Sequence, residues 1–302
     1  MPTQTPTEHS TITLADGRRI EVLAEGPEDG IPLVRHHGTP GGGLVSYPPM
    51  AETELARGFR SIHLARPGYS QSTPRPGRRV ADVAGDVAEI MDALGAGTFL
   101  TIGWSGGGPH ALACAALLPG RCLAAASVAG VAPREAPGLD WLAGMGPENI
   151  AEFGAAEAGP AELTGYLEKE AAGLGSVTGA SIIEGLGGLI GDADKAVLTG
   201  EYADYMAASL HASVDPGVAG WFEDDLAFVA GWGFSFGADA APVAIWQGDD
   251  DHMVPFGHGQ WLAAHIPGAQ AHLLPGEGHL SLSVNHYGQI LDDLLALAGR
   301  GA

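Results

Sequence analysis

The sequence predicts an α/β protein in which a doubly wound, mainly parallel sheet carries an inserted helical cap. Three observations lead to this prediction. Short apolar runs alternate with segments of helical periodicity near both ends of the chain. A serine lies in a glycine-rich turn between one such run and the helix that follows it. Residues 134–235 break the alternation and contain no convincing strand. Strands that alternate with helices at this spacing are typical of a parallel sheet covered on both faces.

The first half of the chain contains the N-terminal part of the expected sheet. Asp16-Gly17 between two β-prone segments is a hairpin signal. Five residues at helical spacing, from Val83 to Leu94, predict an amphipathic helix that Gly95 can end. The expected strands are 11–14, 19–24, 31–34, 59–64, the run that ends at Gly103, and 123–131, and the expected helices are 80–94 and the segment after Ser105.

The second half returns to the same alternation after residue 235. Apolar runs predict strands at 242–246 and 271–274, with a helix over 256–265 between them. The last helix is amphipathic, because its large apolar residues share one face. These are Tyr287, Ile290, Leu291, Leu294 and Leu295.

Residues 134–235 are expected to be helical segments inserted between two core strands. They hold 17 acidic and three basic residues, with scattered glycines. The predicted division is a core formed by residues 1–133 and 236–302, with residues 134–235 as the helical cap or lid.

Charge and composition restrict the class of partner. The formal net charge is −22, and such a surface repels the phosphates of nucleic acids and anionic membranes. We therefore expect a small-molecule substrate, no nucleic-acid partner and no membrane partner. Assembly into a homo-oligomer is left open.

The two cysteines, Cys114 and Cys122, are expected to be free thiols in a reducing compartment. The polar N-terminus lacks a signal-peptide layout, and no run of 18 apolar residues is present. The expected location is the cytoplasm.

Ser105 is the candidate nucleophile. It stands in Gly103-Trp104-Ser105-Gly106-Gly107, after a β-prone run and before a helix of small residues. A serine on so tight a turn requires glycines two positions away on each side, because a Cβ there would collide. With 47 glycines, chance alone yields roughly 0.3 such matches. A second match around Ser235 leads into another strand, so we interpret Ser235 as a loop serine.

A serine hydroxyl needs a base, and the base needs an orienting carboxylate. On a doubly wound sheet these partners follow the serine in the order acid, then histidine. The acid is expected after the strand 242–246, where Asp249, Asp250 and Asp251 stand together. The base is expected after the strand 271–274, where His279 lies in a glycine-containing loop.

The developing oxyanion needs fixed N–H donors. One is expected to be the backbone of Gly106, at the N-terminus of a helix. The other is expected to come from the early glycine-rich loop, from the backbone of Thr39.

With these elements in this order, the chain resembles the α/β-hydrolase fold superfamily, in particular its serine-nucleophile branch of esterases and proline iminopeptidases. The resemblance implies that the acid is Asp251, which stands three residues after the loop glycine and four before the proline. Four motifs carry the resemblance: His37-Gly38-Thr39-Pro40-Gly41, Arg66-Pro67-Gly68-Tyr69-Ser70-Gln71-Ser72, Gly103-Trp104-Ser105-Gly106-Gly107, and Gly248-x-x-Asp251-x-x-Val254-Pro255 followed by Gly278-His279.

The resemblance implies a serine hydrolase that cleaves a small-molecule ester or a related acyl bond through an acyl-enzyme, with no metal or organic cofactor. An aminopeptidase is the alternative within enzymes, although its family typically places a tryptophan after the serine, whereas Trp104 precedes Ser105. A ligand-binding protein with little turnover is the alternative outside enzymes.

Candidate substrate-binding residues are Trp104, beside the nucleophile, and Trp221 and Phe222, in the aromatic end of the cap. An aminopeptidase would also need carboxylates for the substrate ammonium. The candidates for this role are Glu201, Glu223 and Asp224.

Overall fold

A computed structural model describes residues 7–300 of the chain. Within these residues, eight strands form one sheet in the order β1-β2-β4-β3-β5-β6-β7-β8. Only the β1–β2 and β2–β4 pairs are antiparallel, and the other neighbours are parallel. The strands are β1 (Thr7–Thr13), β2 (Arg19–Glu25), β3 (Ile31–His36), β4 (Phe59–Leu64), β5 (Phe99–Trp104), β6 (Cys122–Val128), β7 (Val243–Gly248) and β8 (Gln270–Leu274).

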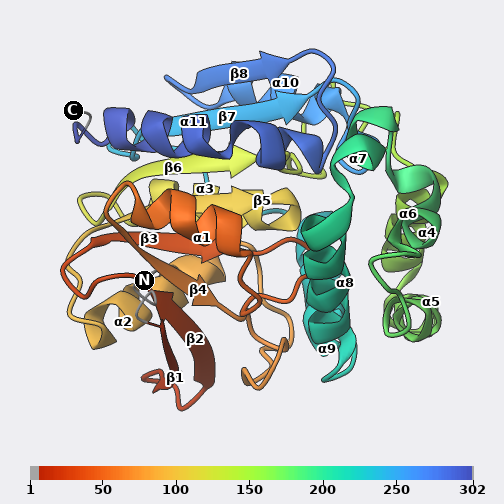
Figure 1. Cartoon of the computed structure of the whole chain (residues 1–302), viewed down its shortest axis with the longest axis horizontal. Helices are drawn as coiled ribbons and strands as arrows, with labels where there is room; N and C mark the ends of the chain where they lie inside the picture. The colour runs from red at the N-terminus through yellow and green to blue at the C-terminus, as the bar shows by residue number, and fades with distance from the viewer. Residues whose placement is uncertain (1–6, 301–302) are drawn as a thin grey trace.

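Helices cover both faces of this sheet (Figure 1). On one face α1 (Pro48–Leu55) and α11 (Ser281–Leu297) bury an apolar layer that includes Leu100, Ile102 and Leu291. The opposite face carries α2 (Asp82–Ala93), α3 (Gly108–Leu117) and α10 (Phe256–His265). Central strands therefore contribute apolar side chains in both directions, as expected for a doubly wound sheet. The predicted fold class is confirmed.

The chain between β6 and β7 forms a set of helices beyond the carboxyl ends of the parallel strands (Figure 1). This is where ligands bind in open α/β sheets. The boundaries 134–235 of the cap stay a prediction. Its helices are α4 (Pro147–Ala158), α5 (Pro160–Leu174), α6 (Ile182–Leu186), α7 (Asp192–Val197), α8 (Gly200–Val214) and α9 (Ala219–Val229), with short 3-10 turns at η1 (Ser105–Gly107) in the core and η2 (Gly187–Leu189) in the cap.

The structure departs from the expected elements at several places, and the first strand, expected over 11–14, begins at Thr7. Helix α1 was not predicted, because it begins with Pro48 and Pro49 and has no clear apolar periodicity. Strand β6 ends at Val128 rather than at residue 131, because Ala129 adopts a positive φ of 50° that leaves the extended conformation.

Cys114 and Cys122 are both free and buried. Among the residues that the structure describes, every helix is too short or too polar to span a lipid bilayer.

Candidate active site

Ser105 stands on a sharp turn between β5 and α3. Its φ is 57°, a conformation that few non-glycine residues adopt, and the half-buried serine lines a cavity at the end of β5. A Cβ on Gly103 would lie 2.1 Å from the carbonyl oxygen of Gly107, and one on Gly107 would lie 2.2 Å from that of His36. Only glycine fits at both positions, which is the steric requirement expected for an elbow that carries a nucleophile.

His279 and Asp251 form a buried pair at the ends of two other loops. The Nδ1 atom of His279 lies 2.8 Å from Oδ2 of Asp251, and both side chains are fully buried. The Nε2 atom of His279 is also buried, and it has no hydrogen-bond partner among the described residues. In the neutral ring Nδ1–H donates to the carboxylate, so Nε2 carries a lone pair that can accept a proton.

Asp251 is held by hydrogen bonds from its own strand and loop. Its Oδ1 accepts from the backbone N–H groups of Met253, at 2.9 Å, and Val254, at 2.7 Å. Its Oδ2 also accepts from Nε2 of Gln247, a fully buried side chain on β7. These donors fix the carboxylate without neutralising it, so Asp251 can orient the imidazole of His279 and stabilise its charge.

The structure separates the three adjacent aspartates. Asp251 lies against His279, whereas Asp249 accepts a 2.6 Å hydrogen bond from the backbone of Gly276. Asp250 is half-buried and points toward the cap. The catalytic roles stay predictions, but only Asp251 of the three meets the geometric requirement for the acid.

The electrostatic surroundings favour a basic His279. Burial by itself lowers the pKa of the imidazole. Three effects outweigh that of burial: the charge of Asp251, the hydrogen bond between Asp251 and the imidazole, and the charge of Asp194. Together they raise the pKa of His279 above its ordinary value.

Thr39 and Gly106 lie next to each other beside the serine. A Cβ on Gly106 would be 2.4 Å from Oγ1 of Thr39 and 3.0 Å from the ring of Phe228. The backbone N–H of Thr39 has no acceptor among the described residues. The structure thus places Thr39, on the loop after β3, beside Gly106, at the start of the helical turn, and their role as oxyanion donors stays a prediction.

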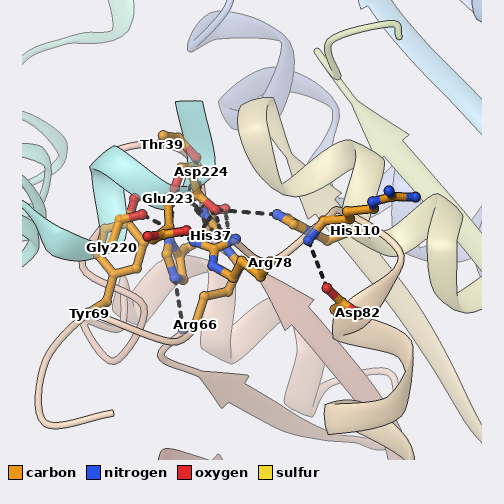
Figure 2. A network of polar contacts seen from close by, with 12 residues as sticks. His37, Thr39, Arg66, Tyr69, Arg78, Asp82, His110, Gly220, Glu223 and Asp224 are labelled. Carbon is orange, nitrogen blue, oxygen red and sulfur yellow. Dashed lines mark hydrogen bonds and ion pairs between the residues drawn. The ribbon is translucent and has the colours of Figure 1, made fainter. Parts of the chain in front are cut away.

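A buried ionic network ties the cap to the loop that carries Thr39 (Figure 2). Asp224 on α9 forms ion pairs with Arg66 and Arg78, each with a 2.6 Å N–O contact. The same carboxylate accepts from Tyr69 Oη and Thr39 Oγ1, both at 2.8 Å. Since Arg66 also donates to the carbonyl of Gly38, a single buried ion pair fixes the backbone from which the oxyanion donor comes.

The network keeps Asp224 ionised and His110 neutral. Burial alone would raise the pKa of Asp224, but Arg66 and Arg78 hold it well below its usual range. Burial lowers the pKa of His110, which lies 3.5 Å from the carboxylate, to about 4. At neutral pH the network therefore contains two guanidinium groups and one carboxylate, with His110 neutral.

Replacing Asp224 by alanine is expected to lower the free energy of unfolding by about 3–5 kcal/mol, because two buried guanidinium groups lose their counter-charge. Urea denaturation checks this value. Asp215→Ala, which removes an exposed cap carboxylate, is the matched control and should change stability by less than about 0.5 kcal/mol. Similar stabilities for the two variants would show that the network is not needed to hold the cap.

Ser105 opens into a cavity of about 30 Å³ between the elbow and the cap. A volume of this size holds only about two water molecules, so a substrate has to displace cap side chains. Its walls are mostly apolar, from Val131, Met145, Phe153, Phe228, Met253 and Val254, and its polar groups come from Thr39, Ser105, Asn149, Glu152 and Asp225.

Glu152 and Asp225 are an acid pair that the sequence analysis missed. Both line the cavity, and Asp225 is fully buried with neither carboxylate oxygen hydrogen-bonded among the described residues. Burial raises the pKa of both groups, that of Glu152 to about 7. Trp221 donates a 2.7 Å hydrogen bond to Glu152. At neutral pH the pair shares a proton, since a second buried negative charge would have no counter-ion.

The predicted aromatic substrate contacts lie elsewhere. Trp221 and Phe222 pack in an apolar cluster that joins cap helices to Ala65 and Tyr69 of the core, and they are not part of the cavity wall at Ser105. Trp104 contacts the ring of His279 and donates to its carbonyl oxygen, and it lines a separate cavity of about 80 Å³ on its other side. Their assignment to substrate binding stays a prediction. Phe228, from the same aromatic region, does reach the cavity at Ser105.

The carboxylates named for a substrate ammonium also lie elsewhere. Asp224 is already paired with two arginines, and Glu223 is buried and accepts from the backbone of Gly77. Glu201 is exposed on α8. None of the three lines the cavity at Ser105, whereas Asp225, one position further along the chain, does.

An elbow serine after β5 and a histidine–carboxylate pair on the loops after β7 and β8 are the arrangement typical of hydrolases with a doubly wound sheet. The sequence profile of the alpha/beta hydrolase fold family matches residues 31–285. The chain therefore belongs to the α/β-hydrolase fold family.

Individual relatives agree with this family. A non-heme chloroperoxidase from Streptomyces lividans is 36% identical over 125 residues, which span 41% of this chain and 45% of that protein. This chain thus matches less than half the length of that relative. A hydrolase from Pseudomonas aeruginosa PA01 superposes with a TM-score of 0.66 at 21% identity, over 97% of this chain and 98% of the other. An esterase from Rhodococcus sp. ECU1013 superposes with a TM-score of 0.61 at 22% identity, over 96% and 98%.

Proposed function

We propose that the protein is a serine hydrolase that cleaves small-molecule esters through an acyl-enzyme on Ser105. The observation that carries this proposal is the buried His279–Asp251 pair, whose Nε2 nitrogen is unpartnered, together with an elbow serine of positive φ on the loop after β5. No cofactor is required by this chemistry, because nucleophile, base and oxyanion donors are all protein groups.

In the first half of the reaction, Oγ of Ser105 attacks the ester carbonyl carbon while its proton moves to Nε2 of His279. Asp251 stabilises the imidazolium that forms. The carbonyl oxygen becomes an oxyanion, which accepts hydrogen bonds from the backbone N–H groups of Thr39 and Gly106. The bond to the leaving oxygen then breaks, and that oxygen takes the proton from His279 and departs as an alcohol.

In the second half, water attacks the acyl-enzyme. His279 accepts a proton from the water, the tetrahedral intermediate forms in the same oxyanion hole, and its collapse releases the acid and returns the proton to Ser105. The small apolar cavity favours short acyl groups, since larger ones require a greater displacement of Phe153 and Phe228.

The test is the loss of ester hydrolysis and of covalent labelling by a fluorophosphonate when the hydroxyl of Ser105 is removed. Labelling of Ser105 identifies the activated nucleophile, and turnover of a set of acyl esters identifies the reaction class.

A second candidate function is the hydrolysis of acyl compounds that carry a free amine, as an aminopeptidase or amino-ester hydrolase would require. The acid pair of Glu152 and Asp225 favours it, because a substrate ammonium would replace the shared proton and supply the missing counter-charge.

The amine preference is measured as the ratio of kcat/KM for an amino-acid ester to that for its desamino analogue. Asp225→Asn is expected to lower this ratio about 10- to 100-fold, because a hydrogen bond to a charged group contributes about 1.5–3 kcal/mol. Hydrolysis of the desamino ester should change little. In the wild type the ratio should rise between pH 6 and 8, because Glu152, with a pKa of about 7, ionises and gives the pair one negative charge.

Glu162→Gln, which alters an exposed carboxylate on α5, is the matched control. Equal kcat/KM values for the two esters with the wild-type enzyme would refute the amine preference and leave ester hydrolysis standing.

A further inference from the structure

One cap residue, Asp194 on α7, reaches the loop that carries His279. Its Oδ2 accepts from the backbone N–H of His279 at 3.1 Å, and its Oδ1 accepts from Leu280 at 2.8 Å and Ser281 at 2.9 Å. The side chain is fully buried. Helix α7 lies beside the beginning of α11, where this loop ends (Figure 1).

The loop is shaped to receive this carboxylate. A Cβ on Gly278 would lie 2.4 Å from Oδ1 of Asp194, so the approach requires glycine there. The next residue after the histidine, Leu280, is fully buried in an apolar cluster with cap residues such as Leu198 and Tyr202. Polar and apolar contacts thus hold the same three-residue stretch against the cap.

The same segment of the cap also touches the loop that carries the acid. A Cβ on Gly191 would lie 2.3 Å from Oδ2 of Asp250, and Ala193 donates a backbone hydrogen bond to that carboxylate. Residues 191–194 therefore contact both loops that present the His279–Asp251 pair.

A role limited to capping α11 would not need this arrangement. The N-cap residue of α11, Leu280, has no side chain that can cap the helix, and a local serine or aspartate would satisfy its N–H groups more simply. Asp194 instead comes from a distant part of the sequence, and one of its three bonds goes to the backbone of His279 itself.

We propose that Asp194 is a positioning residue that holds the main chain of His279 so that its ring meets both Asp251 and the hydroxyl of Ser105. This inference rests on the proposed function. It also makes the cap part of the catalytic apparatus: the geometry of the histidine depends on α7 being in place.

The charged groups around His279 define the expected pH effect. Asp251 faces its Nδ1 from the β7 loop, and Asp194 faces its backbone from α7. Glu277, on the histidine's own loop, accepts from Ser281 and contacts His286 on α11. Asp251 and Asp194 both raise the pKa of His279 against the effect of burial. Removing the charge of Asp194 should therefore lower the pKa of His279.

The experiment compares Asp194→Asn with Asp192→Asn, which removes a fully exposed carboxylate two residues earlier on the same helix. Asp194→Asn is expected to lower kcat about 10- to 100-fold with KM changed less than about twofold, because a small displacement of the base lowers the rate and not binding. The acidic limb of kcat/KM should move to lower pH, since the base loses its proton at lower pH. Asp194→Glu keeps the negative charge, so its pH profile of kcat/KM should have an acidic limb close to that of the wild type.

A second readout does not require turnover. The pKa of His279, followed by NMR of its ring and assigned with His279→Gln, should be lower in Asp194→Asn than in the wild type or Asp192→Asn. Unchanged kcat and an unchanged His279 pKa in folded Asp194→Asn would overturn the inference, as would a lower kcat with no change in the pH limb.

If Asp194→Asn does not fold, Gly278→Ala provides the test, since its methyl group would separate the loop from Asp194. A wild-type kcat and His279 pKa in this variant would contradict a positioning role. A failure of the proposed function would give a different result: the wild type would hydrolyse no ester, and Ser105 would not react with a fluorophosphonate.

Discussion

Replacing Ser105 by alanine is expected to lower the turnover of a short acyl ester by about 10³-fold or more, because no other group can form the acyl-enzyme. KM should change little, since the walls of the cavity and the oxyanion donors remain. The variant should also resist covalent modification by a fluorophosphonate, whereas the wild type is modified once per chain. Steady-state kinetics and intact-protein mass spectrometry measure the two effects.

The chain contains its own control for this experiment. Ser235 stands in the second G-x-S-x-G match, but the structure places it in a loop without secondary structure. Ser235→Ala should therefore retain wild-type turnover and labelling. Near-normal hydrolysis by Ser105→Ala would contradict the assignment of the nucleophile, whatever the behaviour of Ser235→Ala.

Replacing Asp251 by asparagine is expected to lower kcat by about 10³- to 10⁴-fold, because the amide can donate to Nδ1 of His279 and so stabilise the wrong tautomer. The proton then resides on Nε2, which can no longer accept the proton of Ser105. The shape of the loop should persist, since the side-chain oxygen can still accept from Met253 and Val254. The measurement is kcat with a short acyl ester.

Asp249→Asn and Asp250→Asn are matched controls, because they remove neighbouring carboxylates that lie away from His279. Each should retain kcat within about twofold. A loss of equal size in either control would indicate that the charge of the whole loop matters, and not the contact between Asp251 and the imidazole.

The fold class could be predicted from the sequence because most core elements, although not helix α1, have a local signal. The strand before Ser105, the glycines around it and the amphipathic helix from Tyr287 onward are set by the period of apolar residues and by steric exclusion within a few residues. The positions of Ser105 and His279 on loops after strands followed from the same signals, because the carboxyl ends of parallel strands meet at one edge.

The cap did not have such signals. Its acidic residues all look alike in a segment with 17 of them, yet Asp194, Asp224 and Asp225 have three different surroundings. Asp194 accepts three backbone hydrogen bonds, Asp224 is paired with two arginines, and Asp225 is buried beside a second acid, Glu152. These differences arise from contacts between residues far apart in the chain, which no local pattern encodes.

The sequence by itself thus determined the α/β fold and the candidate nucleophile, acid and base. It also determined the order in which the loops that carry these three residues follow the strands. Only the tertiary structure decided what surrounds them: the acid pair beside Ser105, the ionic network behind Thr39 and the cap carboxylate on the histidine loop. The physical reason is the separation along the chain over which each interaction acts. Periodicity and backbone sterics act over a few residues, whereas burial and charge pairing depend on which distant segments the packed cap brings to the carboxyl edge of the sheet.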